Sequence, residues 1–149
     1  EARLRQAELA ALSEIAHIRR AYLELGWVDP VGSSGSIKAI ASVLAASGES
    51  GESSEGMIHR HGLDTLQKHL IALERLDNVS LEGLKADRAR IFPAGVAILR
   101  AIFEAFGLES MRYSDGALRE GVLHDLQRVR GYSRTPSDRC GLPPSRPAP

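Results

Sequence analysis

The chain has 149 residues, of which 43% are hydrophobic, 26% charged and 5% aromatic, as in a single soluble globular domain. Lys plus Arg and Asp plus Glu both number 19, so the formal net charge is zero. This balance argues against a protein built around attraction of the whole molecule to nucleic acid. No apolar run reaches the roughly 18 residues that a membrane span needs. One cysteine, Cys140, cannot form an internal disulfide, so we expect a cytoplasmic protein.

The first half of the chain predicts a helix, a short strand and a second helix. In residues 1–25 apolar side chains recur at steps of three, four or seven, which predicts an amphipathic helix facing the core. Residues 27–31 predict a short extended segment, and a glycine-serine turn then leads into a helix from Ile37. Residues 47–56 contain only Ser, Gly and Glu, so we expect a solvated, flexible loop.

The second half predicts three further helices and one strand. We expect helices over residues 63–76, 96–106 and 117–129, a chain break at Pro93–Gly95, and a strand over 111–114. Five of the seven prolines lie beyond Thr135, which predicts a disordered tail over residues 133–149. Short strands alternating with longer helices indicate an α/β fold with few strands.

The segment Gly32–Lys38 is the strongest candidate for an anion site. Successive Gly and Ser residues between a strand and a helix can point several backbone amides at one anion, and the helix N-terminus adds partial positive charge. Lys38 would add a full charge one turn into the helix. The spacing fits neither GxxxxGK[ST] nor GxGxxG. A flexible turn without a ligand is the alternative.

Two other segments have a similar character. Residues 87–90 place Arg88 beside an apolar run, where an Arg suits bidentate phosphate contact; a solvated charge cluster is the alternative. Residues 114–121 close a predicted strand with short polar side chains before a helix. There the alternative is simple N-capping with a surface pair between Arg119 and Glu120.

The remaining reactive residues give weaker indications. His59, His61 and His69 could gather on a metal, but solvated surface histidines are the expected outcome. Cys140 lies in the proline-rich tail, which makes a catalytic thiol there improbable. The arginines from residue 128 onward could guide a polyanion, and a disordered basic tail is the plainer interpretation.

Three phrases, GWVDPVGSSGSIKAI, LEGLKADRARIFPAGVAIL and SMRYSDGALREGVLHDL, occur in this order. With them the chain resembles the exopolyphosphatase and guanosine pentaphosphate phosphohydrolase family from Ala2 to about Thr135. The resemblance implies a partial actin-like (ribonuclease H-like) domain of the sugar-kinase-like superfamily, in which two α/β domains face each other across a cleft. It implies metal-assisted hydrolysis of a terminal phosphoanhydride, with Mg²⁺ as the usual cofactor and polyphosphate or guanosine pentaphosphate as substrate.

The resemblance also implies which part of the protein this is. Residues 1–132 match the C-terminal portion of the second domain, and residues 133–149 leave the family pattern. The family's two Asp-x-Gly phosphate loops and its water-activating acid lie upstream, so no catalytic residue or metal ligand is expected here. The expected contribution is one phosphate-binding wall, formed by Gly32, Ser33, Ser34, Gly35, Ser36, Lys38, Arg88, Gly95, Ser114, Asp115 and Gly116.

Other functions remain open at this stage. One is a non-catalytic polyanion-binding or regulatory module, and another is an interaction module whose first helix pairs with another chain. The chain begins without an initiator Met, and we expect it to be a fragment whose natural partner is the N-terminal domain of its parent. Absent strands would leave sheet edges open, so the isolated chain is expected to dimerise, to swap elements or to be only marginally stable. It is also expected to be inactive, because the resemblance places the catalytic residues upstream. The sequence does not separate polyphosphate from guanosine pentaphosphate.

Overall fold

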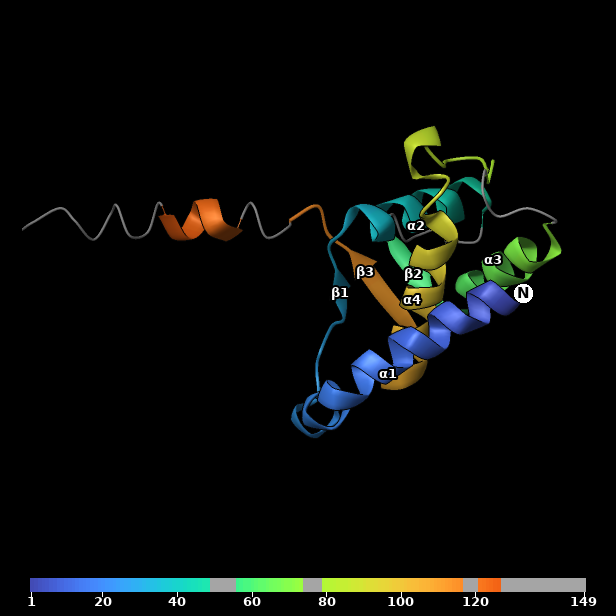
Figure 1. Ribbon diagram of the computed structural model, residues 1–149. Coiled ribbons are helices and arrows are strands. Elements are labelled where there is room, and N and C mark those ends of the chain that lie inside the picture. The colour runs from blue at the N-terminus through green and yellow to red at the C-terminus, as the bar shows by residue number, and fades with distance from the viewer. Residues whose placement is uncertain (49–55, 74–78, 117–120, 127–149) are drawn as a thin grey trace, which may run out of the picture. The chain divides into compact units, whose positions relative to one another are not determined.

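The computed structural model describes residues 1–48, 56–73, 79–116 and 121–126, and the chain divides into two units, Glu1–Asp115 and Gly116–Pro149. In the second unit residues 121–126 are helical, within the helix predicted over residues 117–129. The rest of that helix and the whole tail predicted over residues 133–149 lie outside the described residues. The predicted loop also falls largely outside them. The first unit is a mixed α/β fold (Figure 1) with the elements α1 (Ala2–Leu25), β1 (Val31–Gly32), α2 (Gly35–Ala46), β2 (Met57–His59), α3 (Arg60–Ala72), the 3₁₀ helix η1 (Ala86–Arg88), α4 (Phe92–Phe106) and β3 (Ser110–Tyr113).

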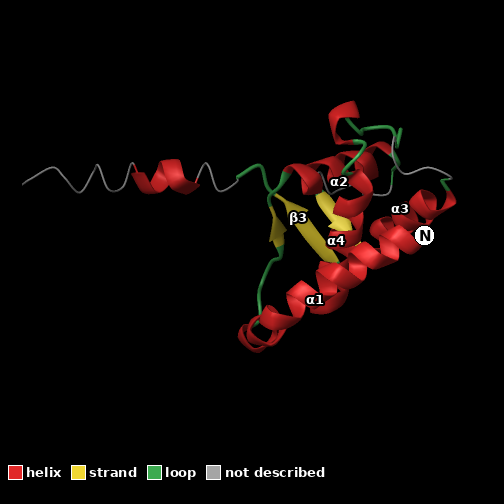
Figure 2. Ribbon diagram, in the orientation of Figure 1, coloured by secondary structure: helices red, strands yellow, loops and turns green. Residues whose placement is uncertain are grey.

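The sheet has the strand order β1-β3-β2, with β1 parallel and β2 antiparallel to β3 (Figure 2). Side chains alternate between its faces. Met111 of β3 and its register partner Ile58 of β2 are buried in the core, whereas Arg112 and its partner Val31 are exposed. The sequence missed β2, because a three-residue strand with one buried side chain has too little alternation to detect.

The core is centred on α4. Eight of its fifteen residues are buried, and a helix that is apolar on most of its circumference belongs in the interior. Helices α1, α2 and α3 all pack against it, α1 most extensively. The largest fully buried side chains are Phe103, Ile40, Leu44, Ile58, Leu63, Leu70, Leu99 and Val96.

The C-terminal end of α4 is capped from several sides. Gly107 adopts the left-handed conformation at φ 65° and ψ 35°, and the Leu108 amide donates to the Phe103 carbonyl at 2.9 Å. Arg60 also donates to the Phe103 carbonyl at 3.0 Å, and Arg19 Nε donates to the Ala105 carbonyl at 2.6 Å. These bonds satisfy carbonyls that have no partner within the helix, and the two guanidinium groups offset its dipole.

The burial prediction for the first helix is wrong over its C-terminal half. Leu4 is buried as expected, but Ile18 and Tyr22 are about half exposed and Leu25 is 85% exposed. The apolar stripe exists, yet its second half is only partly covered, near the end of α4, where Tyr22 meets Phe106 edge-to-face at 6.1 Å between ring centroids. A shallow apolar hollow of about 260 Å³ lies there.

The predicted chain break at Pro93–Gly95 is also wrong. Helix α4 begins at Phe92, with Pro93 in its first turn, a position that suits proline because no amide is lost there. The Gly95 amide bonds to the Ile91 carbonyl at 3.1 Å, so Gly95 is helical and not a turn residue. Helix α3 starts three residues before the predicted residue 63, immediately after β2. No helix in the described ranges is long and apolar enough to cross a membrane.

A charged network joins α1, α3 and α4 around Arg100. Its guanidinium contacts Glu8 at 2.9 Å and Asp64 at 3.0 Å, and also bonds the Gln67 side-chain oxygen. The side chains of Arg100 and Glu8 are only 27% and 18% exposed. Losing one partner would leave carboxylates partly desolvated and unpaired.

We therefore expect Arg100→Ala to lower the free energy of unfolding by about 2 kcal/mol, below the range for fully buried pairs because this network is partly solvated. Urea denaturation of the chain measures this loss. The double variant Glu8→Gln/Arg100→Met should recover part of the stability, since it removes the less exposed of the two carboxylates together with Arg100 and leaves only Asp64 without its partner. A single variant as stable as the parent sequence would contradict a structural role for the network.

Candidate phosphate-binding site

The parallel strands β1 and β3 end side by side, and their carboxyl ends form the candidate site. The Ser114 amide donates to the Gly32 carbonyl at 2.9 Å, which ties the segment after β3 to the turn after β1. In open α/β sheets, ligands bind at the carboxyl ends of parallel strands, where loops and helix N-termini gather. The predicted glycine-serine turn and the end of the predicted strand at Ser114 therefore meet at one edge of the sheet.

The turn after β1 leads directly into α2. Ser34 is the N-cap residue, and its Oγ accepts a hydrogen bond from the Ile37 amide at 3.1 Å. The Lys38 amide bonds the Ser34 carbonyl at 2.9 Å. Within the described part of the chain, the amides of Gly35 and Ser36 have no hydrogen-bond partner. Two free amides at the start of a twelve-residue helix offer donors and partial positive charge to an anion.

Lys38 and Asp115 bridge α2 and the end of β3. The Lys38 ammonium lies 2.8 Å from Asp115 Oδ1, and the Tyr113 hydroxyl donates to the same oxygen. The ammonium also lies 5.8 Å from the centroid of the Tyr113 ring. The hydrogen bonds from Lys38 and then Tyr113 lower the pKa of Asp115, while the Asp115 carboxylate raises the pKa of both donors.

Arg88 is held against the first residue of α2. The 3₁₀ helix η1 ends at Arg88, and a Cβ added at Gly35 would lie only 2.9 Å from Arg88 Nη1. The guanidinium therefore occupies space that any larger residue at position 35 would take. Its nearest recorded carboxylate is Asp87, 3.8 Å from Arg88 Nε. Arg88 and Lys38 thus flank the first turn of α2.

Gly95 contributes by letting α4 approach this turn. A Cβ at Gly95 would lie 3.3 Å from the Ser36 Cβ, which is closer than most such contacts. A glycine inside a helix costs about 1 kcal/mol relative to alanine, and here the cost allows α4 and α2 to pack closely beside the turn. Gly95 is therefore a packing residue of the site.

A small cavity of about 130 Å³ opens beside this turn, between α2 and the segment leading into η1. Three cationic side chains reach it. The lining residues are Gly35, Lys38, Ala39, Ser42, Gly83, Lys85 and Arg88. Among these lining residues none is acidic, so the chemistry of the cavity favours an anionic group. The combination of amides, hydroxyls, ammonium and guanidinium groups is suited to phosphate.

A family model described as the Ppx/GppA phosphatase family matches residues 1–129. The chain belongs to the Ppx/GppA phosphatase family.

Individual relatives agree with this membership. The chain is 42% identical over 126 residues to a guanosine-5'-triphosphate,3'-diphosphate pyrophosphatase of Aeromonas hydrophila, covering 85% of this chain and 24% of that protein. It is 37% identical over 123 residues to a putative exopolyphosphatase of Haemophilus influenzae, covering 83% and 37% respectively. The chain therefore spans about a quarter to just over a third of the length of these curated relatives.

In this Ppx/GppA chain the structure brings ten of the eleven predicted site residues to one edge of the first unit. Gly116, the eleventh, begins the second unit. Sequence reasoning missed Tyr113, which bonds Asp115, and also missed Lys85 and Gly83, which line the cavity. Lys85 stands in the charged segment that drew attention to Arg88, and nothing in its own pattern distinguished it.

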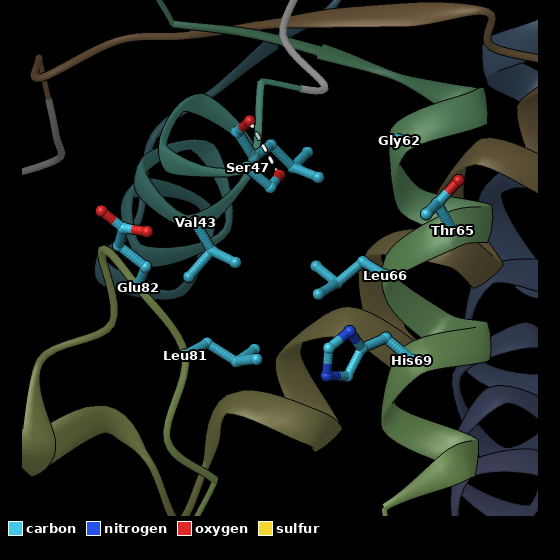
Figure 3. A pocket seen from close by; sticks show the side chains of 9 residues that line it. Val43, Ser47, Gly62, Thr65, Leu66, His69, Leu81 and Glu82 are labelled. Carbon is cyan, nitrogen blue, oxygen red and sulfur yellow. Dashed lines mark hydrogen bonds between the residues drawn. The ribbon is translucent and has the colours of Figure 1, made fainter.

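The other candidates do not form sites in the described part of the chain. Among the described residues, His59, His61 and His69 are not brought together in a group that could hold a metal ion. His69 instead points toward Leu81 in a second hollow of about 340 Å³ between α2 and α3 (Figure 3). No Lys or Arg lines that hollow. Cys140 and the tail arginines lie outside the described residues.

We expect the Asp115 carboxyl to titrate below the ordinary Asp value of about 3.9, since Lys38 and Tyr113 hydrogen-bond its charged form. A carboxyl whose pKa is depressed by folding stabilises the fold above its unfolded pKa, and this contribution is lost as the pH falls through the folded value. Carboxyl-selective ¹³C NMR measures the midpoint. Lys38→Gln should raise the midpoint, and Tyr113→Phe should raise it less. An unchanged midpoint in Lys38→Gln would contradict the ion pair.

Proposed function

We propose that this chain is part of a phosphoanhydride hydrolase that releases terminal phosphate from inorganic polyphosphate or guanosine pentaphosphate, and that it supplies one phosphate-binding wall of the active-site cleft. The observation that carries the proposal is the meeting of Lys38, Arg88 and the free amides of Gly35 and Ser36 at one helix start. Family membership and the activities for which the relatives are named support the same chemistry.

Each group has a physical role in this proposal. The terminal phosphates carry charge that shifts toward the leaving oxygen as the anhydride breaks, so fixed donors that match the developing charge lower the barrier. The amides of Gly35 and Ser36 position phosphate oxygens, and the Arg88 fork can engage two of them at once. Lys38 acts as a point charge, and it exchanges Asp115 for a phosphate oxygen when substrate binds. We place the residue that activates water outside this chain.

Mg²⁺ belongs to the proposal for the whole protein. When bound, such an ion would neutralise phosphate charge. The carboxylate at the β3 end of the wall, Asp115, is engaged by Lys38 and Tyr113. The described residues also bring no three potential metal ligands together. These residues do not fit a Mg²⁺ site.

We also propose that the wall works opposite the N-terminal domain of a longer parent in the cytoplasm. The fraction of the relatives that this chain covers supports that arrangement, and so does the use of a single cysteine. On this view the isolated chain binds polyanions weakly and does not turn them over.

Phosphate release tests the function directly. The chain and its full-length parent are assayed side by side with Mg²⁺ on medium-length polyphosphate and on guanosine pentaphosphate. The proposal expects turnover of at least one substrate by the parent and none by the chain alone, and the faster reaction identifies the preferred substrate. A parent inactive on both substrates would overturn the hydrolase assignment and favour a polyanion-binding module.

A further inference from the structure

The cavity beside the phosphate wall has an unbalanced positive charge. Lys38 is neutralised by Asp115, and Arg88 has Asp87 at 3.8 Å. Lys85 is exposed, and its ammonium makes no hydrogen bond or ion pair with any residue that the structure describes. Three cations therefore border one cavity with two carboxylates nearby, neither of which lines it.

Two glycines shape this cavity. Gly83 has φ 80°, and a Cβ added to it would lie 2.5 Å from the Ser42 carbonyl oxygen of α2. The segment that carries Lys85 can therefore lie against α2 only because residue 83 has no side chain. Gly35, the first residue of α2, plays the equivalent part for Arg88, because a Cβ there would meet the guanidinium. The backbone thus holds Lys85 and Arg88 on one side of the cavity and α2 on the other.

We propose that this cavity is a second phosphate subsite, in which Lys85 binds a phosphate group adjacent to the one at the start of α2. The inference rests on the proposed function and makes it more specific. Arg88 and Gly35 border both the helix start and the cavity, so consecutive groups of one chain of phosphates would reach both. The ligand class is therefore an extended inorganic polyphosphate.

The size and lining of the cavity support this ligand class. A volume of about 130 Å³ is well below the roughly 300 Å³ at which pockets accept drug-sized ligands. It suits a phosphate group better than a nucleoside. No aromatic side chain lines the cavity, whereas proteins that bind single-stranded nucleic acid stack bases on aromatic rings. The lining offers three cationic side chains and the Ser42 hydroxyl, which suit linear polyphosphate.

The lysine content of the chain permits a direct test. Lys38, Lys68 and Lys85 are the only lysines in the sequence, and Lys68 is an exposed residue of α3 that does not line the cavity. Reductive methylation with ¹³C-formaldehyde keeps the charge and labels each lysine for NMR, and Lys→Arg variants assign the three signals. Medium-length polyphosphate should shift the Lys38 and Lys85 signals and leave Lys68 in place, while inorganic phosphate should act chiefly on Lys38.

The outcomes separate the subsite from the proposed function. If Lys38 shifts and Lys85 behaves like Lys68, the second subsite is wrong and the phosphate wall stands. If neither Lys38 nor Lys85 shifts, both fail. Equal shifts produced by an oligodeoxythymidylate would overturn the assignment to polyphosphate and favour single-stranded nucleic acid.

Affinity measurements give a second readout. Lys85→Gln should weaken binding of medium-length polyphosphate by about tenfold and leave binding of inorganic phosphate within about twofold, because only the longer ligand reaches both groups. Lys68→Gln makes the same charge change on α3 and serves as the matched control. Equal losses in the two variants would show a general charge effect and overturn the subsite. Heteronuclear NMR spectra of each variant confirm that it is folded.

Discussion

Replacing Arg88 with alanine in a full-length parent of this chain is expected to lower kcat/KM for polyphosphate by about 100- to 1000-fold. The guanidinium lies beside Gly35 at the start of α2, where it would meet phosphate oxygens whose charge changes during the reaction. Steady-state phosphate release measures the effect. Because the interaction should strengthen in the transition state, we expect kcat to fall as well as the affinity for substrate.

Two further variants control this experiment. Arg90 lies two residues after Arg88, and its side chain is exposed and does not line the cavity. Arg90→Ala therefore removes an equal charge and should reduce kcat/KM by less than threefold. Arg88→Lys keeps the charge without the planar fork, so it should restore only part of the activity. Equal losses in Arg88→Ala and Arg90→Ala would contradict a specific role for Arg88.

The largest effect on stability is expected from Gly83→Ala. The backbone of Gly83 has φ 80°, in the left-handed region that favours glycine. A methyl group on it would lie 2.5 Å from the Ser42 carbonyl oxygen and 2.9 Å from the carbonyl carbon. A backbone atom cannot move aside as a side chain can, so the segment must leave α2. We expect the free energy of unfolding to fall by about 3 kcal/mol, measured by urea denaturation of the chain.

Gly26 provides a matched control for the clash. Its φ of 70° is also positive, with ψ at 178°, but a Cβ there would have no atom within 4 Å. Gly26→Ala should therefore cost only the conformational strain, about 1 to 2 kcal/mol. Equal losses at the two positions would mean that the segment before η1 is not held against α2.

Gly35→Ala should cost little stability, since Arg88 is flexible enough to move, but it should weaken anion binding.

Most helices could be predicted from the sequence. The spacing of apolar residues predicts α1, α2 and α4, with Gly26 and Gly107 marking the ends of α1 and α4, and alternation predicts strand β3. The exposure of the second half of α1 could not be predicted, because a periodic stripe shows which face is apolar but not which neighbours cover it. The start of α4 was misplaced because Pro93 and Gly95 were interpreted as a break, although proline suits a first helical turn.

The candidate site was predictable to the extent that it depends on local pattern. The glycine-serine turn and Ser114–Asp115 lie at the ends of two strands, and parallel pairing brings such ends together. Lys85 and Gly83 could not be identified in this way. Their importance depends on a close approach to Ser42, about forty residues earlier in the chain, and no local periodicity encodes that contact.

A titration of the ¹⁵N-labelled chain with tripolyphosphate tests whether the start of α2 and Arg88 together bind phosphate. We predict that the largest shifts occur at the amides of Gly35 and Ser36 and at Arg88 Nε, and that Arg88→Ala abolishes them while Arg90→Ala does not. Shifts confined to the arginine-rich residues from 128 onward, with the Gly35 and Ser36 amides unchanged, would contradict it.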